Sequence, residues 1–202
     1  MHRRMGLFTL AMLLAAMAFA LPAQAGDRAH DNGFFLRLSG GGGSASTDLE
    51  YGGSKLKLDG TTADLNVAIG AIVARNLALH GTLWGWAISN PDMTMDSFTA
   101  ETDGNLMLSA VGIGLTYYFM PVNMYLSGSV GAGQLTAEED GETSDSDTGP
   151  IVDITLGKEW WVGSSWGLGV ALSGGYHSIP DGGIDASWQG TSFAVRFTAT
   201  LN

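Results

Sequence analysis

The chain has 202 residues, a formal net charge of −11 and no cysteine. The lack of cysteine excludes disulfide bonds, thiol catalysis, cysteine-ligated metals and a lipidated N-terminal cysteine, and the negative charge disfavours nucleic acid as a partner because it repels phosphates. Thirty glycines against five prolines, with 45% aliphatic and aromatic residues, favour a single domain built from many short strands.

Residues 1–25 have the three parts of a secretory signal peptide. A basic start, MHRR, precedes the apolar run MGLFTLAMLLAAMAFAL and the small-residue cleavage site PAQA. Cleavage after Ala25 removes two arginines and no acid, so the formal net charge becomes −13, and residues 26–32 remain as a short N-terminal segment. The alternative is an uncleaved membrane anchor, which the small residues before Gly26 and the polar stretch GDRAHDNG disfavour.

Eight later segments alternate apolar side chains with polar or small ones at a period of two. In chain order they are FFLRLSGGGG, TADLNVAIGAIVA, LALHGTLWGWA, LMLSAVGIGLTYYF, MYLSGSVGAGQL, IVDITLGKEWW, WGLGVALSGGY and SFAVRFTATLN. Past residue 30 no apolar run approaches the ~20 residues that a transmembrane helix needs. This pattern predicts an all-β protein, an eight-stranded antiparallel up-and-down transmembrane β-barrel over residues 33–202.

The connections between these segments alternate in length. Short links, RN, MPVN and VGSS, follow the second, fourth and sixth segments, whereas the links over 46–61, 88–104, 136–149 and 177–190 are long. An apolar-x-apolar-Gly pattern recurs before each short link, at 67–70, 111–114 and 154–157. We therefore expect a repeated hairpin unit, with short turns at one rim of the barrel and long loops at the other.

Aromatic residues flank the short links. Trp160 and Trp166 lie on the apolar face beside VGSS, and Tyr117 and Phe119 occupy the same position beside MPVN. Such rings favour a membrane–water interface because the ring is apolar while its N–H or O–H reaches water. The alternative is that they fill an ordinary core beneath a turn. Trp161 has the opposite parity and is expected either to cap the lumen or to lie in the turn.

With these features, and with the segments GLTYYFMPVNMYLSGSVG and LGKEWWVGSSWGLGV, the chain resembles the eight-stranded bacterial outer-membrane β-barrel proteins, the small OmpA-like and OmpX-like barrel domains. The resemblance covers residues 33–202 and implies an outer-membrane location after loss of the signal peptide. It implies no activity, because these proteins share a shape rather than a catalytic motif. The chain departs from the family in ending Thr200-Leu201-Asn202, where an aromatic residue usually helps assembly.

The competing fold is a soluble barrel of the lipocalin kind. Such a barrel must fill its interior with large apolar side chains, whereas the second face of these segments carries glycine, alanine, serine, threonine and ionisable residues. Charges at mid-strand are tolerable where they meet one another or water, and costly where they face lipid. The polar face is therefore expected to line the lumen.

Six ionisable residues are predicted to form a charge cluster that plugs this lumen: Arg37, Asp64, His80, Asp153, Glu159 and Arg196. Arg37 and Arg196 lie on the first and last strands, which pair in a closed barrel, so we expect them to be neighbours. Asp153 and Glu159 are their expected partners, with Asp64 nearer the loop rim and His80 nearer the turn rim. The alternative is separate solvation of each group by trapped water.

The long links carry fifteen of the twenty acidic residues. Asp140, Glu142, Asp145 and Asp147 have the hard oxygen ligands that Ca²⁺ takes, or that bridge divalent cations to anionic lipopolysaccharide. The stretch lacks the ligand spacing of an EF-hand, so a solvated acidic loop is the favoured interpretation. We predict no cofactor and no metal site; the expected partner is outer-membrane lipid, with divalent cations or surface ligands at the acidic loops.

The favoured function is that of a non-enzymatic outer-membrane barrel with a structural or surface-interaction role. A lipid-modifying barrel enzyme and a narrow conduit for small apolar solutes are the alternatives. Nucleophilic catalysis needs a hydroxyl within reach of a histidine. His177 and Ser178 are the nearest candidates, but adjacent residues on a strand point to opposite faces, and His80 stands alone on its polar face.

Overall fold

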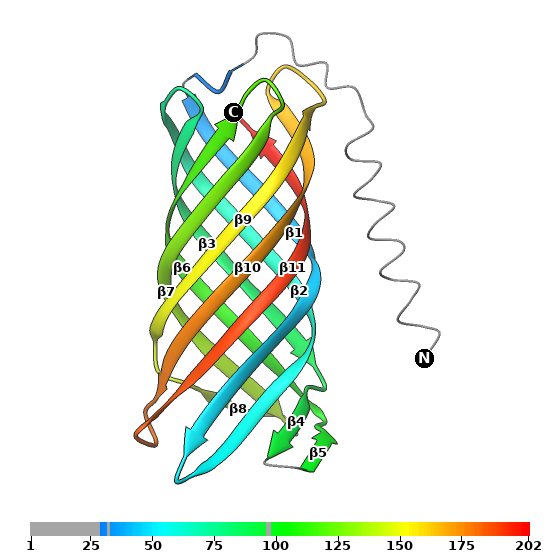
Figure 1. Ribbon diagram of the computed structural model, residues 1–202, viewed down its shortest axis with the longest axis vertical. Coiled ribbons are helices and arrows are strands. Elements are labelled where there is room, and N and C mark those ends of the chain that lie inside the picture. The colour runs from blue at the N-terminus through cyan, green and yellow to red at the C-terminus, as the bar shows by residue number, and fades with distance from the viewer. Residues whose placement is uncertain (1–28, 32, 96–97) are drawn as a thin grey trace, which may run out of the picture.

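The computed structural model describes residues 29–31, 33–95 and 98–202, and these form strands joined by turns (Figure 1). The predicted signal peptide, residues 1–25, lies outside the described residues, and of the segment 26–32 only residues 29–31 are described. Over the described ranges, no helix has the length and apolar character needed to cross a membrane.

Eight of the eleven described strands close into a ring, which confirms the predicted barrel (Figure 1). Closure follows from β1, which pairs antiparallel with β2 on one side and with β11 on the other. The ring strands are β1 (Gly33–Tyr51), β2 (Ser54–Ala74), β3 (Leu77–Ser89), β6 (Gly104–Phe119), β7 (Met124–Glu139), β9 (Gly149–Trp161), β10 (Trp166–Asp181) and β11 (Ala186–Leu201). Three short strands lie outside it: β4 (Asp92–Met95), β5 (Phe98–Glu101) and β8 (Glu142–Asp145).

The two ends of the barrel differ as the link lengths predict. The turns β2–β3, β6–β7 and β9–β10 lie together at one end with the C-terminus, and the remaining connections lie at the other end (Figure 1). We call these ends the turn rim and the loop rim. At the turn rim Asn76, the second residue of the β2–β3 turn, takes a φ of 62°, in the left-handed region that asparagine enters more readily than most residues.

The four long links are less irregular than the sequence predicted. Most residues of the links 46–61 and 177–190 continue the ring strands, and β1 and β2 meet in a two-residue hairpin turn at Gly52 and Gly53, both with positive φ. A second such turn, at Asp140 and Gly141, joins β7 to β8. Positive φ at both central residues matches the right-handed twist of the paired strands. The polar composition of these stretches had hidden their continued pairing.

The outward face of the barrel is apolar around its circumference. Side chains that exceed 50% exposure here would be buried in a water-soluble protein of this size. They come from most of the ring strands: Phe34, Leu65, Ile69, Val73, Leu83, Val111, Ile113, Leu115, Val130, Ile154, Phe193 and Phe197. We call this surface the apolar belt. Exposure of this apolar surface to water is unfavourable. In a membrane-spanning barrel lipid covers such a surface.

The interior contains apolar residues that the sequence pattern did not predict. A loop-side cluster and a turn-side cluster lie inside the two ends of the barrel. The loop-side cluster is Ala45, Trp84, Trp86, Ile88, Leu106, Leu108, Ala110, Leu135, Ile151 and Ile179. The turn-side cluster is Phe35, Ala68, Ile72, Ala78, Tyr118, Tyr125 and Ala171. The expectation of a lumen lined only by small and ionisable residues is therefore wrong. On β3 the buried tryptophans Trp84 and Trp86 alternate with Gly85 and Ala87. Neither face of the strand is polar there, so the sequence pattern does not indicate which face points inward.

Candidate functional site

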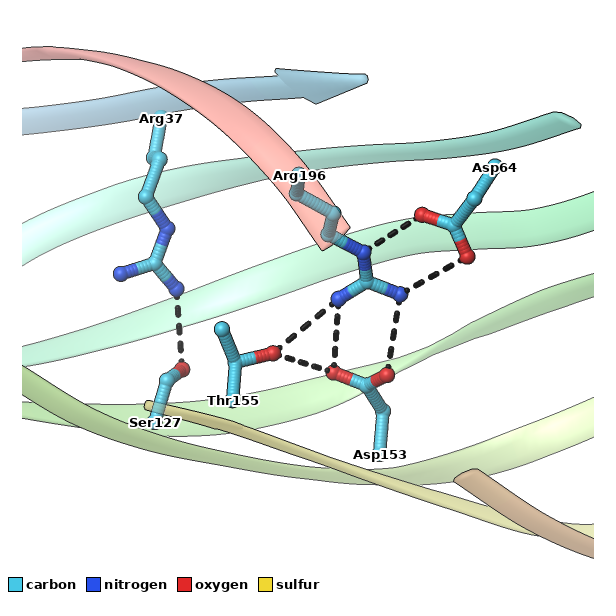
Figure 2. Close-up of polar contacts among 6 residues, drawn as sticks. All are labelled: Arg37, Asp64, Ser127, Asp153, Thr155 and Arg196. Carbon is cyan, nitrogen blue, oxygen red and sulfur yellow. Dashed lines mark hydrogen bonds and ion pairs between the residues drawn. The ribbon is translucent and has the colours of Figure 1, made fainter. Parts of the chain in front are cut away.

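Arg196 on β11 is the centre of a charged layer inside the lumen. Its Nε and Nη2 donate to the carboxylate of Asp64 on β2, and its Nη1 and Nη2 donate to Asp153 on β9 at 3.1 and 3.0 Å (Figure 2). Nη1 also donates to the hydroxyl of Thr155 at 3.0 Å. All five N–H groups of the guanidinium thus have an acceptor. We call Arg196, Asp64, Asp153 and Thr155 the Arg196 layer.

Arg37 on β1 occupies a separate layer nearer the turn rim. Its Nη2 donates to Ser127 at 2.9 Å and to Thr116 at 3.2 Å, and its guanidinium carbon lies 4.4 Å from the centre of the Tyr125 ring. Figure 2 shows this side chain apart from the Arg196 group. The direct neighbours of the Arg37 charge are therefore an aromatic ring, which makes a cation–π contact, and two neutral hydroxyls.

The expectation that the two arginines are neighbours is wrong. Arg37 pairs in register with Thr200 of β11, whereas Arg196 pairs with Gly41 of β1. Four residues of strand separate the two positions, which is about 13 Å at the usual rise of a strand. Pairing of the first and last strands was predicted correctly, but the stagger between them decides which residues meet.

Glu159 on β9 belongs to the Arg37 layer. Its Oε1 accepts a hydrogen bond of 2.6 Å from Thr200 and a longer one, 3.4 Å, from Thr198. The Glu159 carboxylate, 1% exposed, acts electrostatically on Arg37. The prediction that Glu159 also partners Arg196 is not met, because Asp64 and Asp153 fill that role.

His80 on β3 joins the Arg37 layer through Thr116. The hydroxyl of Thr116 donates to Ser127 at 2.8 Å, so it accepts from His80 Nε2, which lies 3.0 Å away. The predicted charge cluster therefore divides in two: Arg196 with Asp64 and Asp153, and Arg37 with His80 and Glu159.

The glycines of the recurring apolar-x-apolar-Gly pattern make room for two of these lumen side chains. Gly70 and Gly114 pair with His80 from either side, and a Cβ on Gly114 would come within 2.5 Å of the His80 ring. Gly157 pairs with Tyr125, and a Cβ there would overlap the Tyr125 ring. The repeat thus marks inward positions that must stay small, a role its spacing alone did not reveal.

A hydroxyl–imidazole pair lies in the loop-side half of the lumen. Thr47 Oγ1 and His177 Nε2 are 3.0 Å apart, and the His177 ring centre is 6.2 Å from that of Trp86. Both partners are buried, at 0% and 2% exposure. Ser178, the partner considered from sequence, points to the other face of β10. Thr47 escaped notice because it is 130 residues away in the chain.

His30, which sequence reasoning also missed, closes the turn rim from inside. Its ring stacks on Tyr118 with centres 3.8 Å apart and lies 5.0 Å from the Trp161 ring. Of the two expectations for Trp161, the lumen cap is the one that this contact favours.

The predicted interface aromatics lie outside the barrel near the turn rim. Tyr117, Phe119 and Trp166 are 46%, 46% and 41% exposed, and the first two rings meet edge to face at 5.0 Å. Trp160 is outward on β9 but half-buried, with Lys158 Nζ 5.6 Å from its ring centre. Their position at a membrane–water boundary stays a prediction.

At the loop rim, the acidic residues of the β7–β8 hairpin are exposed. Within the part of the chain that the structure describes, no group of three or more His, Asp or Glu side chains is arranged to hold a metal ion. Divalent cations at these acids therefore stay a prediction.

Comparison with known proteins gives a likeness in fold alone. No family model matches the chain, and no curated protein sequence matches it. Among solved structures, Neisserial surface protein A (NspA) has 13% sequence identity and a TM-score of 0.54, over 84% of this chain and 97% of NspA. The outer membrane protein OprG from Pseudomonas aeruginosa has 13% identity and a TM-score of 0.46, over 86% and 98%. The attachment invasion locus protein Ail of Yersinia pestis has 14% identity and a TM-score of 0.41, over 81% and 97%.

The fold and the outer surface lead to one assignment. The ring of eight strands among the described residues has the architecture of the outer-membrane barrels, and the apolar belt is a surface for lipid. The chain is therefore an eight-stranded antiparallel β-barrel with the fold of the outer-membrane barrels and an outer surface suited to lipid, as the sequence predicts.

Proposed function

We propose that this protein is a closed, non-enzymatic barrel with a structural or surface-interaction role, whose acidic loop rim faces outward. The observation that carries the proposal is the filled lumen. Along the barrel from the turn rim come the turn-side cluster, the Arg37 layer, the Arg196 layer and the loop-side cluster. Eight strands enclose only enough space for side chains, and here side chains take it up.

The charged layers argue against an ion pathway. In the Arg196 layer every guanidinium N–H is bonded to a carboxylate or hydroxyl. An ion that passed would have to break bonds between fully desolvated charges, and breaking such a buried pair typically costs ~3–5 kcal/mol. The loop-side cluster adds an apolar barrier beyond it.

The lumen also argues against catalysis. Thr47 and His177 have the chemistry of a nucleophile and a base, but they are buried under Trp86 and inside the barrel wall. The His80 ring is committed to Thr116 in the Arg37 layer. A lipid substrate would reach neither histidine without displacing the side chains that bury it.

The loop rim is the surface that remains for function. On the β1–β2 hairpin Lys55 pairs with Asp48, and Lys57 with Asp59, both at 3.0 Å. The β7–β8 hairpin, by contrast, exposes Glu139, Asp140 and Glu142. Strand pairing holds this acidic surface in place, which suits cationic partners or anionic ones bridged by divalent cations.

Location and closure can be tested together on whole cells and on purified protein. Surface proteolysis of intact cells is expected to cut within residues 140–148 and to leave the ring strands protected, and the purified barrel is expected to give no steady conductance in planar bilayers. A stable channel would overturn closure, and a soluble periplasmic product would overturn the location. Turnover of lipids in proteoliposomes that is lost in His177→Gln would overturn the non-enzymatic role.

A further inference from the structure

A short strap, residues 29–31, crosses the turn-rim mouth of the lumen. Its backbone is fixed to the β2–β3 turn at two points: Asn76 N–H donates to the His30 carbonyl at 2.7 Å, and His30 N–H donates to Asn76 Oδ1 at 3.0 Å. The His30 side chain is 3% exposed. A segment outside the strand ring thus inserts its imidazole into the barrel end.

Both ring nitrogens of His30 are bonded to asparagine side chains. His30 Nδ1 accepts from the Asn202 amide, and in that tautomer Nε2–H donates to Asn123 Oδ1 at 3.0 Å. This pair of contacts fits the neutral imidazole. A second proton would occupy Nδ1, opposite the N–H of Asn202, so the Asn202 amide would have to turn over to accept it.

None of the side chains that contact the His30 ring carries a negative charge. Tyr118 of β6 and Trp161 of β9 contact it with aromatic rings, and Asn76, Asn123 and Asn202 are neutral. In the strap itself, the exposed carboxylate of Asp31 lies 3.7 Å from Nε of Arg75.

Deeper in the lumen, Arg37 and Glu159 lie behind Tyr118 and have opposite charges. Burial of the His30 ring lowers its pKa from 6.5, against smaller opposing effects of Asn123, Asn202 and Asp31. Docking and protonation of this imidazole therefore oppose each other.

We propose that the strap is a proton-sensitive closure of the lumen, in which neutral His30 locks the turn-rim mouth and protonated His30 releases it. Release would open a vestibule at the turn-rim mouth. It would not open a pore, because the Arg196 layer and the loop-side cluster lie beyond and do not involve the strap. The vestibule is the space that the His30 ring vacates beside Tyr118 of the turn-side cluster.

Access to the vestibule can be measured with a single thiol, since the natural chain has no cysteine. Ala78→Cys places it on the inward face of β3 in the turn-side cluster, at a buried position. The rate of modification by a small aromatic disulfide that reacts at acid pH is measured in the folded barrel in detergent. Thr148→Cys, at an exposed position, corrects for the reagent's own pH dependence.

The strap proposal gives different results for three backgrounds. With His30 present, corrected labelling is expected to be slow at neutral pH and roughly tenfold faster at pH about 5, below the usual pKa of histidine. In His30→Gly it is expected to be fast at both, and added imidazole should slow it by refilling the niche. In His30→Gln, which cannot take up a proton, it is expected to stay nearly constant with pH.

Two results would overturn the proposal. If His30→Gly labels as slowly as the parent at neutral pH, the strap does not close the mouth. If His30→Gln shows the same acceleration in acid as the parent, the pH response belongs to other groups. The mobility shift on heating in detergent confirms for each variant that the barrel is folded before labelling is compared.

Discussion

Arg196 and Asp64, which are 132 residues apart in the chain, form a two-bond ion pair inside the lumen, from guanidinium Nε and Nη2 to the two carboxylate oxygens. Asp153 holds the other edge of the same guanidinium. One cation thus sits between two buried carboxylates, and this imbalance has a direct consequence for mutants.

Loss of the cation is expected to be worse than loss of either anion. Arg196→Gln leaves two buried carboxylates without a counter-charge, so we expect the unfolding free energy to fall by ~3–5 kcal/mol. In Asp153→Asn the ion pair between Arg196 and Asp64 remains, and the new amide oxygen still accepts a hydrogen bond. We therefore expect the unfolding free energy to fall by ~1–3 kcal/mol. Urea unfolding in detergent measures both, with the exposed Asp147→Asn as control. Equal losses for the two lumen variants would refute the shared-cation arrangement.

Glu159 is expected to support Arg37 alone. Glu159→Gln should lower the unfolding free energy because the charge facing Arg37 disappears while the Thr200 hydroxyl keeps an acceptor. A double-mutant cycle with Arg37→Met should show a coupling of ~0.5–3 kcal/mol, the range for residues in one network. The same cycle between Glu159→Gln and Arg196→Gln should show much weaker coupling. Strong coupling to Arg196 would restore the single cluster that the sequence suggested.

Gly157 is expected to tolerate no side chain. A Cβ at this position would overlap the buried Tyr125 ring, so Gly157→Ala should cost ~1–3 kcal/mol through overpacking. Gly128 also lies on a ring strand, but a Cβ added there would meet no atom within 4 Å. Gly128→Ala is therefore the matched control and should be close to neutral. Similar thermal midpoints for the two alanine variants would show that Tyr125 is free to move.

Two outward positions on β10 are expected to differ in their tolerance of charge. Trp166 lies beside the turn rim and Leu172 lies farther along the strand, and both are exposed on the lipid side. Lysine should cost ~0–1 kcal/mol at an interface and ~2–4 kcal/mol near the bilayer centre. Refolding of Trp166→Lys and Leu172→Lys into lipid vesicles measures the difference. A larger loss of stability for Trp166→Lys than for Leu172→Lys would contradict the interface position of the Trp166 ring and favour an ordinary core contact.

Stability is expected to depend on pH through His30. Burial lowers its pKa from 6.5 in the folded barrel, so between the two values the unfolded chain binds more protons and the unfolding free energy rises with pH. The contribution of His30 to the unfolding free energy is fully present above the pKa of this residue in the unfolded chain. It is lost as the pH falls towards the pKa of His30 in the folded barrel. Urea midpoints of the parent and of His30→Gln should therefore converge on acidification from pH about 8 to about 5. A constant gap would show that His30 does not titrate in this range.

The sequence by itself determined the elements and the two faces of the wall. Alternation with a period of two is a local property, so Leu65, Ile113 and Ile154 could be placed outward and Arg37 and Arg196 inward before any contact was known. Link lengths fixed which ends of the strands meet at the turn rim. These features depend on neighbours along the chain, which a sequence displays directly.

The tertiary structure decided which inward residues meet. Contact across a lumen depends on strand stagger and tilt, which placed Arg196 between Asp64 and Asp153 and moved Arg37 about four residues of strand away from it. Alternation also fails where both faces are apolar or small, as at Trp84 and Trp86 on β3. Docking of His30 was beyond the sequence as well, because its niche is assembled from segments far apart in the chain that only closure of the barrel brings together.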